Sequence, residues 1–243
     1  MKHAILSLVL LGSLSFSGIA AEARKPMKQN QPGFNAAEKN VFSTYRIRIF
    51  ASKEVADEAE EEGFLHFERS SDSDMLIGMG TGFAISPWHI VSAAHVAVKD
   101  ATFFLDVFDQ EGVYVESVPM MLLKVDRSDP NKDLALFKTF KELPNHTVLR
   151  YGTARVGDWC YTVGARHGQV PFCVGWGILA TKQHETFPGM WMATILAAPG
   201  NSGGPVYNAK HQLLGVLVRG FPGAGMTLFV KADTVKAFLD GAL

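Results

Sequence analysis

A serine set among glycines is the feature of this sequence that points most directly to chemistry. Residues 199–206 read Pro-Gly-Asn-Ser-Gly-Gly-Pro-Val, with Ser202 at their centre. The glycines leave its hydroxyl uncrowded on a tight turn, and they allow backbone conformations that are closed to other residues. Neighbouring N–H groups can then turn toward an oxyanion as it forms. The pattern therefore predicts a serine nucleophile for acyl transfer.

The segment 200–204 also fits the G-x-S-x-G turn of α/β-hydrolases, in which a strand runs directly into a helix. Two observations argue against that interpretation. Pro205, followed by Val206 and Tyr207, suits the start of a strand better than a helix interior. In α/β-hydrolases the acid and then the histidine follow the serine, whereas the one later histidine here is His211, with no carboxylate before it. The partners of Ser202 must therefore lie upstream.

Upstream, His95 ends a segment with a second recognisable pattern. Residues 80–96 contain two short apolar runs around a Ser-Pro turn, and the second run ends in Ser-Ala-Ala-His at position 95. This part of the chain resembles the chymotrypsin-fold serine peptidases, in which an apolar strand delivers the general-base histidine at such a turn. The catalytic residues of that family follow the order His, Asp, Ser. The resemblance thus implies an acid between His95 and Ser202.

Asp133 fits the position of the acid best, because the polar loop 128–132 precedes it and the apolar run 134–137 follows. Asp126 and Asp129 are weaker alternatives, since both lie in the polar loop and Asp129 precedes a proline. Each candidate alone has an ordinary structural explanation, such as a turn aspartate. Their order and flanking residues together favour catalysis. The implied roles are Ser202 as nucleophile, His95 as general base and acid, and Asp133 as the group that orients the imidazole.

More of the chain resembles the bacterial HtrA-type branch of this family. The matching segments are Arg-Val-Gly-Asp-Trp at 155–159, the apolar run to position 164, and Gly-Trp-Gly-Ile-Leu-Ala at 175–180. The resemblance covers about residues 40–243 and implies an all-β fold of two six-stranded antiparallel β-barrels with a short C-terminal helix. It assigns a trypsin-like serine protease domain to residues 41–243. We expect no PDZ module, which departs from typical HtrA proteins and speaks against PDZ-dependent substrate delivery.

The resemblance also implies an oxyanion hole and a substrate pocket. The N–H groups of Gly200 and Ser202 match the Gly-x-Ser pattern of the hole. The pocket would be walled by segments 196–198 and 218–220, through Leu196, Ala198, Val218 and Gly220. Neither segment contains an acidic residue, so cleavage after aliphatic residues is expected rather than after Lys or Arg. Arg219 leaves two alternatives open: its side chain points into the pocket and favours an acidic residue, or it faces water. Val218 replaces a small polar residue often found in trypsin-like enzymes, which weakens the expected support of Asp133.

The elements that must position these residues are short strands. Alternation at 45–50 predicts one strand, and from residue 75 onward strand-like runs recur between Gly, Pro, Asn and Asp. That rhythm is typical of a sandwich or barrel. Ser52 can cap a helix over 52–63 whose acids favour a solvated surface, with a regulatory loop as the alternative. Residues 232–243 form a closing helix with Val235, Phe238 and Leu239 on one face. The remaining strands are expected at 75–85, 102–108, 112–124, 134–138, 158–164, 170–180, 190–197, 205–208, 212–218 and 226–230.

The two cysteines lie in strand-like runs on either side of a turn near residues 166–168. If the strands pair symmetrically about that turn, Cys160 and Cys173 face each other. In an oxidising compartment this predicts a disulfide, and two buried reduced thiols are the alternative. The spacing does not fit a metal site and no H-E-x-x-H motif occurs, so neither a metal nor a cofactor is expected.

The N-terminus predicts export. A basic start, an apolar run at 4–19 and small residues near position 20 are typical of a signal peptide over 1–21, with a membrane anchor as the weaker alternative. Residues 22–40 are polar and Pro/Gly-containing, and we expect a flexible arm there. The chain is 47% hydrophobic with net charge −1, which favours a folded enzyme over a nucleic-acid-binding protein.

These expectations define a periplasmic or secreted serine endopeptidase that acts on protein or peptide substrates. Two other classes stay open: a catalytically silent binding protein with the protease fold, and an esterase for small acyl substrates. No nucleic acid and no stable membrane anchor after signal cleavage are expected. The sequence does not determine the oligomeric state.

Overall fold

The computed structural model describes residues 36–61, 75–129, 131–169, 171–221 and 224–242. The expected signal peptide and residues 22–35 of the expected arm lie outside this part of the chain. Helix α1 spans Ala36–Phe42. Within it Asn40 is buried. Its amide donates to the carbonyl of His211 at 3.2 Å and to the hydroxyl of Tyr161 at 3.3 Å. Residues 36–40 of the expected arm thus form part of helix α1.

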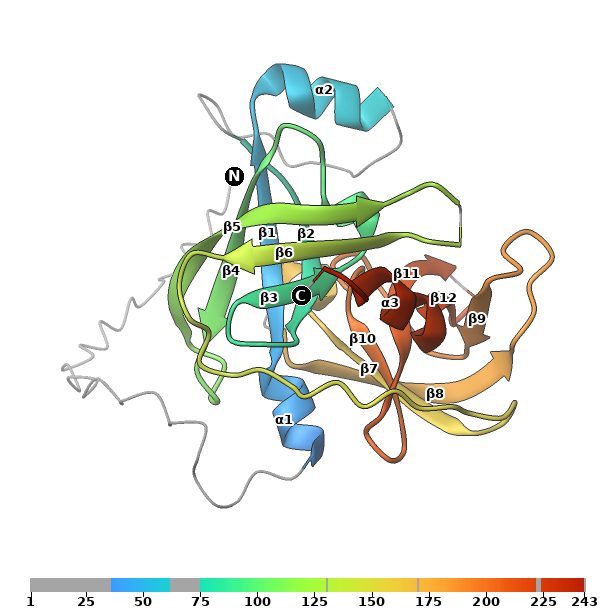
Figure 1. Ribbon diagram of the computed structural model, residues 1–243. Helices are drawn as coiled ribbons and strands as arrows, with labels where there is room; N and C mark the ends of the chain where they lie inside the picture. The colour runs from blue at the N-terminus through green and yellow to red at the C-terminus, as the bar shows by residue number, and fades with distance from the viewer. Residues whose placement is uncertain (1–35, 62–74, 130, 170, 222–223, 243) are drawn as a thin grey trace, which may run out of the picture.

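The chain forms two closed barrels of six antiparallel strands each, which confirms the predicted fold class (Figure 1). The first barrel pairs its strands in the order β1-β2-β3-β6-β5-β4, and the second in the order β10-β11-β12-β9-β8-β7. Closure leaves neither sheet with an open edge. The first six strands are β1 (Thr44–Ala51), β2 (Met75–Ala84), β3 (His89–Ser92), β4 (Thr102–Phe108), β5 (Tyr114–Asp126) and β6 (Leu134–Thr139). The others are β7 (Trp159–Gly164), β8 (Cys173–Thr181), β9 (Met190–Ala193), β10 (Pro205–Asn208), β11 (Leu213–Phe221) and β12 (Met226–Lys231).

Strand β1 shows why the alternating sequence folds in this way. Ile47 and Ile49 are fully buried inside the first barrel, whereas Arg46 and Arg48, which alternate with them, point to the other face. Successive side chains of a strand point to opposite faces, so one face enters the core. The two arginines then bind the buried carboxylate of Asp106 on β4, at 2.7 and 2.8 Å.

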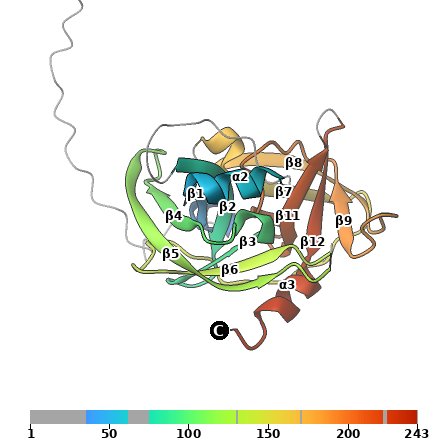
Figure 2. The ribbon, with the colours of Figure 1, turned by 90° about the horizontal axis from the view of Figure 1, so that it is seen from above.

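One large apolar core joins the barrels. It contains Ile47 and Phe83 of the first barrel together with Tyr161, Val163 and others of the second. Helix α3 (Ala232–Leu239) packs beside both barrels, as Figure 2 shows. Its residues Val235, Phe238 and Leu239 are buried, which confirms the predicted apolar face.

Helix α2 (Lys53–Glu61) lies at one end of the first barrel (Figure 1). Ala56 is buried against the barrel, whereas Glu54, Asp57 and Glu58 are exposed. This arrangement agrees with a solvated surface helix. None of the helices that the structure describes is long and apolar enough to cross a membrane.

Candidate active site

His95 lies in a short 3-10 turn, Ala94–Val96, directly after strand β3. We call this segment the histidine turn. Asp133 precedes strand β6, which pairs with β3, so the sheet brings the two side chains together. The carboxylate of Asp133 lies 2.6 Å from the ring Nδ1 of His95, and it also accepts the backbone N–H of His95 at 2.9 Å. One carboxylate thus holds both the ring and the backbone of the histidine.

The environment of Asp133 keeps it ionised. Burial favours the neutral acid, but hydrogen bonds from the ring and the amides of the histidine turn outweigh this effect, so the pKa of Asp133 lies below its ordinary value of 3.8. An ionised carboxylate at Nδ1 places the ring proton on Nδ1 and leaves Nε2 free to accept a proton. This is the tautomer that a general base requires.

Ser202 lies beside the histidine turn, across two glycines. A Cβ placed on Gly80 would lie 2.8 Å from Cγ2 of Val96 and 3.4 Å from the carbonyl oxygen of Ser202, so Gly80 fits between the two segments. Gly203 approaches the other side, because a Cβ there would lie 2.8 Å from the backbone nitrogen of Ala93. The backbone around Ser202 therefore packs closely against the segments on either side of His95.

The turn before Ser202 has a defined orientation. Gly200 has a φ of +92°, and a Cβ at this position would collide with the carbonyl oxygen of Ala165. The carbonyl of Pro199 accepts the N–H of His167 at 2.7 Å. Because the peptide is trans, the N–H of Gly200 points the opposite way. Among the residues described, neither this N–H nor that of Ser202 donates to a protein acceptor, so both are available to an oxyanion.

Thr81 of strand β2 connects the first barrel to this turn. Its hydroxyl donates to the carbonyl of Gly200 at 2.6 Å and accepts the N–H of Ala165 at 2.9 Å. Its backbone N–H donates to the carbonyl of Ser202 at 2.8 Å. Thr81 is fully buried, so these bonds are shielded from water. One residue thus fixes the backbone on both sides of Asn201.

The two segments expected to wall a substrate pocket do meet, but not through all of the expected side chains. A Cβ on Gly220 would lie 3.5 Å from Cβ of Ala197. Gly220 and Ala198 are half-buried and remain candidates. Leu196 is 54% exposed, and its neighbour Ile195 is fully buried. Val218 is buried in the core that joins the barrels. The wall roles of Leu196, Ala198, Val218 and Gly220 stay predictions.

The side chain of Arg219 could point into the pocket or face water, and its position distinguishes these two alternatives. Its guanidinium lies over the ring of Phe187, 5.1 Å from the centroid, on the loop between β8 and β9. Arg219 is exposed, so it faces solvent.

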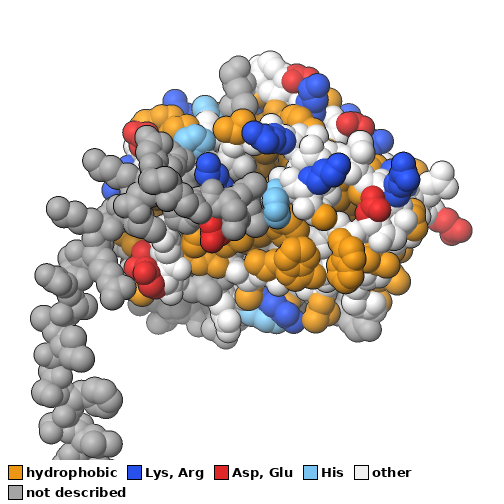
Figure 3. All heavy atoms as spheres, turned by 90° about the horizontal axis from the view of Figure 1, so that it is seen from below, with side chains coloured by type: hydrophobic (Ala, Val, Ile, Leu, Met, Phe, Trp, Pro, Cys, Tyr) orange, Lys and Arg blue, Asp and Glu red, His pale blue; other side chains and the backbone are white. Residues whose placement is uncertain are grey.

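Exposed apolar side chains also occur on β8, where Val174, Trp176 and Ile178 are exposed like Leu196. Figure 3 shows hydrophobic side chains gathered on the face seen from below, where β7 and β8 lie.

The predicted disulfide is wrong, because both cysteines are free in the structure. Strands β7 and β8 pair with Cys160 opposite Gly177 and Cys173 opposite Gly164. The two cysteines are thus displaced by four residues, or about 13 Å along the strands, whereas a disulfide needs Cα atoms within about 7 Å. Burial raises the pKa of the Cys160 thiol to about 11, which makes it a weak nucleophile.

Sequence reasoning missed Thr81 and His167. Both act on the Ser202 turn across long separations in sequence, and no short motif marks such a contact. The one local signal is the position of Thr81 between Gly80 and Gly82, in a strand whose glycines indicate a close approach of backbones.

Comparison with known proteins identifies the family that this fold and site define. A family model described as a trypsin-like peptidase domain matches residues 80–216, which is more than half of the chain. The chain therefore belongs to the trypsin-like peptidase domain family, and the two-barrel structure agrees with it.

Individual relatives are bacterial proteins named "Probable periplasmic serine endoprotease DegP-like". The one from Pseudomonas savastanoi pv. phaseolicola is 28% identical over 176 residues, covering 70% of this chain and 34% of the relative. The one from Rickettsia prowazekii is 29% identical over 191 residues, covering 72% of this chain and 36% of the relative. The match thus spans about a third of the length of these relatives.

Proposed function

We propose that this protein is an exported serine endopeptidase that hydrolyses peptide bonds through an acyl-enzyme. The observation that carries the proposal is the His95–Asp133 pair, 2.6 Å apart, beside a glycine-bounded serine turn with two unused amides. Membership of the trypsin-like peptidase family and the names of the relatives support it. Export is supported by the signal-like residues 1–21 and by the word "periplasmic" in those names.

In this mechanism His95 takes the proton of Ser202 through Nε2 as the hydroxyl oxygen attacks the substrate carbonyl. The C–N bond breaks as His95 returns the proton to the leaving amine, and water then releases the acyl group by the same route. Asp133 keeps the ring in the required tautomer and stabilises the imidazolium. The N–H groups of Gly200 and Ser202 bind the oxyanion, and one such donor contributes about 3 to 4 kcal/mol.

We further propose that the enzyme prefers a small or medium aliphatic residue before the cleaved bond. The two segments meet at Ala197 and Gly220, which are small and carry no charge. Arg219 lies over Phe187 instead of pointing between them. A charged substrate side chain at this place would lack a partner, which disfavours it.

A fluorophosphonate probe tests the proposal on the mature protein. We expect one label on Ser202, found by mass spectrometry, and none on Ser202→Ala. Ser52→Ala is the matched control, because Ser52 is an exposed serine directly before helix α2 and its loss should leave labelling unchanged. Absence of label on the folded wild-type protein would overturn the proposal in favour of a silent binding protein.

Substrate assays distinguish an endopeptidase from an esterase. Cleavage of casein or of a peptide library after aliphatic residues would support an endopeptidase. Hydrolysis of small esters with no cleavage of any peptide would instead favour an esterase.

A further inference from the structure

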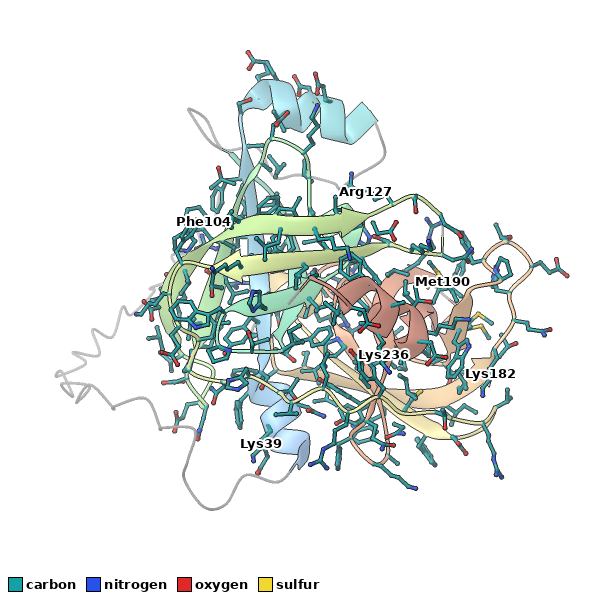
Figure 4. The ribbon with its side chains drawn as sticks, viewed as in Figure 1. Lys39, Phe104, Arg127, Lys182, Met190 and Lys236 are labelled. Carbon is teal, nitrogen blue, oxygen red and sulfur yellow. The ribbon has the colours of Figure 1, made fainter. Side chains whose placement is uncertain are left out.

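Arg127 contacts the histidine turn through backbone carbonyls, whereas Asp133 contacts it through a backbone N–H. It is the first residue after strand β5, and Figure 4 shows its side chain at that end of the strand. Its Nη2 donates to the carbonyl oxygens of Ala94 and Ala97, both at 2.6 Å. These two carbonyls lie before and after His95, so one guanidinium spans the residue that carries the imidazole.

The histidine turn has little structure of its own. Two backbone bonds close it, from Val96 N–H to the carbonyl of Ala93 at 3.2 Å and from Ala97 N–H to the carbonyl of Ala94 at 2.9 Å. Its N-cap residue Ala93 makes no side-chain cap bond, so the N–H of His95 depends on Asp133, which lies 38 residues away in sequence. Short 3-10 turns have poor hydrogen-bond geometry, and their last carbonyls need partners from outside. Arg127 supplies such a partner to the carbonyl of Ala97, and it adds a second donor to the carbonyl of Ala94.

Arg127 and Asp133 begin and end the same loop, 127–133. Asp133 binds the N–H of His95 and its ring, while Arg127 binds the carbonyls on either side. The loop is itself tied to the second barrel, because the side-chain oxygen of Asn131 accepts the N–H of Gly189 at 2.9 Å. The backbone of His95 is therefore held from both directions by one anchored hairpin.

We propose that Arg127 is a positioning residue for His95, which sets the rate of acylation by fixing the histidine turn. The inference rests on the proposed role of His95. Proton transfer from Ser202 depends on the position of the imidazole, and a misplacement of about 1 Å costs about 10²-fold in rate. Because Arg127 holds the turn that carries the base, its loss acts on the chemical step and leaves substrate binding nearly unchanged.

Arg127→Met, Arg127→Lys and the control Arg150→Met test this inference. Arg150 is an exposed arginine, so its replacement matches the loss of charge without touching the turn. Fluorophosphonate inactivation is resolved into a maximal rate and a half-saturating concentration. We expect Arg127→Met to lower the maximal rate about 10- to 100-fold with an unchanged half-saturating concentration. Arg127→Lys should recover most of the rate, because an ammonium can also donate to two carbonyls. Equal maximal rates for Arg127→Met and the wild type would overturn the inference.

Amide hydrogen exchange of the peptide containing residues 93–98 gives a readout independent of activity. Faster exchange there in Arg127→Met, with no change in Arg150→Met, supports the inference, and unchanged exchange refutes it. If the wild type takes no label, the proposed function fails, and exchange still decides whether Arg127 holds the turn. If Arg127→Met does not fold, Arg127→Gln takes its place in both measurements, because the shorter amide side chain is neutral and does not reach both carbonyls. A rate and an exchange pattern of Arg127→Gln equal to those of Arg150→Met would overturn the positioning role.

Discussion

At the scale of single residues, the site depends on which carboxylate faces His95. Three aspartates near the end of the β5–β6 hairpin compete for this role in the sequence, and Asp133 alone lies 2.6 Å from Nδ1. Asp126 instead accepts the hydroxyl of Ser128, and Asp129 accepts the amide of Asn131. The two weaker candidates therefore shape the loop, and Asp133 faces the base.

Asp133→Asn should lower the rate of Ser202 acylation by about 10⁴-fold, the size of effect seen when the orienting carboxylate is removed from a Ser-His-Asp site. The amide favours the wrong tautomer of His95 while keeping the geometry. Asp126→Asn is the matched control and should leave the rate near that of the wild type. Rates of probe labelling at Ser202 measure both, and a comparable loss in the two variants would contradict the assignment.

The same carboxylate predicts a dependence of stability on pH. Because the pKa of Asp133 is lower in the folded protein than its ordinary value of 3.8, its contribution to stability is complete above that value. The contribution is lost as the pH falls through the folded-state pKa. Urea unfolding from neutral to acidic pH should therefore show a smaller acid-induced loss of stability for Asp133→Asn than for the wild type. Equal losses in the two proteins would show that Asp133 contributes nothing to the loss of stability at acidic pH.

The hydroxyl of Thr81 is a second single group on which the candidate site depends, because it fixes the turn before Ser202. Thr81→Val keeps the shape of the side chain but leaves Gly200 O and Ala165 N–H without their partner. We expect a loss of about 1 to 3 kcal/mol in the free energy of unfolding. The labelling rate should also fall, by up to about 10²-fold, because Gly200 is no longer held. Thr102→Val, at an exposed position on β4, is the control. An unchanged labelling rate in Thr81→Val would show that the turn before Ser202 keeps its geometry without the Thr81 hydroxyl.

At the scale of elements, the Ser202 turn packs against the strand that leads to His95, and this needs a glycine. Gly203 has a φ of +86°, and a Cβ there would collide with Ser92 Oγ and Thr81 O. Gly157 has a φ of +94° with nothing within 4 Å of such a Cβ. Gly157→Ala should therefore cost about 1 to 2 kcal/mol for backbone strain alone. Gly203→Ala should cost more than about 4 kcal/mol, since the overlap is with neighbouring segments. Similar costs, measured by urea unfolding, would mean that the segments move apart easily.

The fold can be predicted from sequence because the strands leave a local trace, such as the alternation of β1. The candidate site residues His95, Asp133 and Ser202 are also marked by their flanks alone. Pairing register leaves no such trace. Symmetric pairing of β7 and β8 about residues 166–168 fails, because a 3-10 turn at Arg166–Gly168 and the residues after it shift the register by four. Arg127 and Thr81 were missed for the same reason, because their partners are remote in sequence.

The corrected register makes a prediction of its own. The mature protein, denatured without reductant, should expose two thiols that react with a thiol reagent. In the native state Cys160 should react slowly, because it is buried and its pKa is raised to about 11. Loss of both thiols in the unreduced denatured protein would instead indicate a disulfide and a different register.

At the scale of the whole molecule, the barrels depend on each other. Their shared core contains Phe83 from one and Tyr207 from the other. Arg46 of the first barrel also donates to the carbonyl of Gly168 in the second at 2.6 Å. An interface of this kind makes separate unfolding of one barrel costly, because it would expose the core of both. We therefore expect a single cooperative transition.

Single-tryptophan variants test this cooperativity. Of the four tryptophans, Trp88 lies in the first barrel between β2 and β3, and Trp191 lies on β9 of the second, where it packs against Phe229. One variant keeps Trp88 and the other keeps Trp191, with the remaining tryptophans replaced by Phe. Far-ultraviolet circular dichroism gives the unfolding of the whole chain in each variant. Within each variant, fluorescence and circular dichroism should give the same urea midpoint, because the active site is assembled from both barrels and neither half persists alone. A fluorescence midpoint that departs from the circular dichroism midpoint in either variant would mean that one barrel unfolds first, and that the site can be lost without global unfolding.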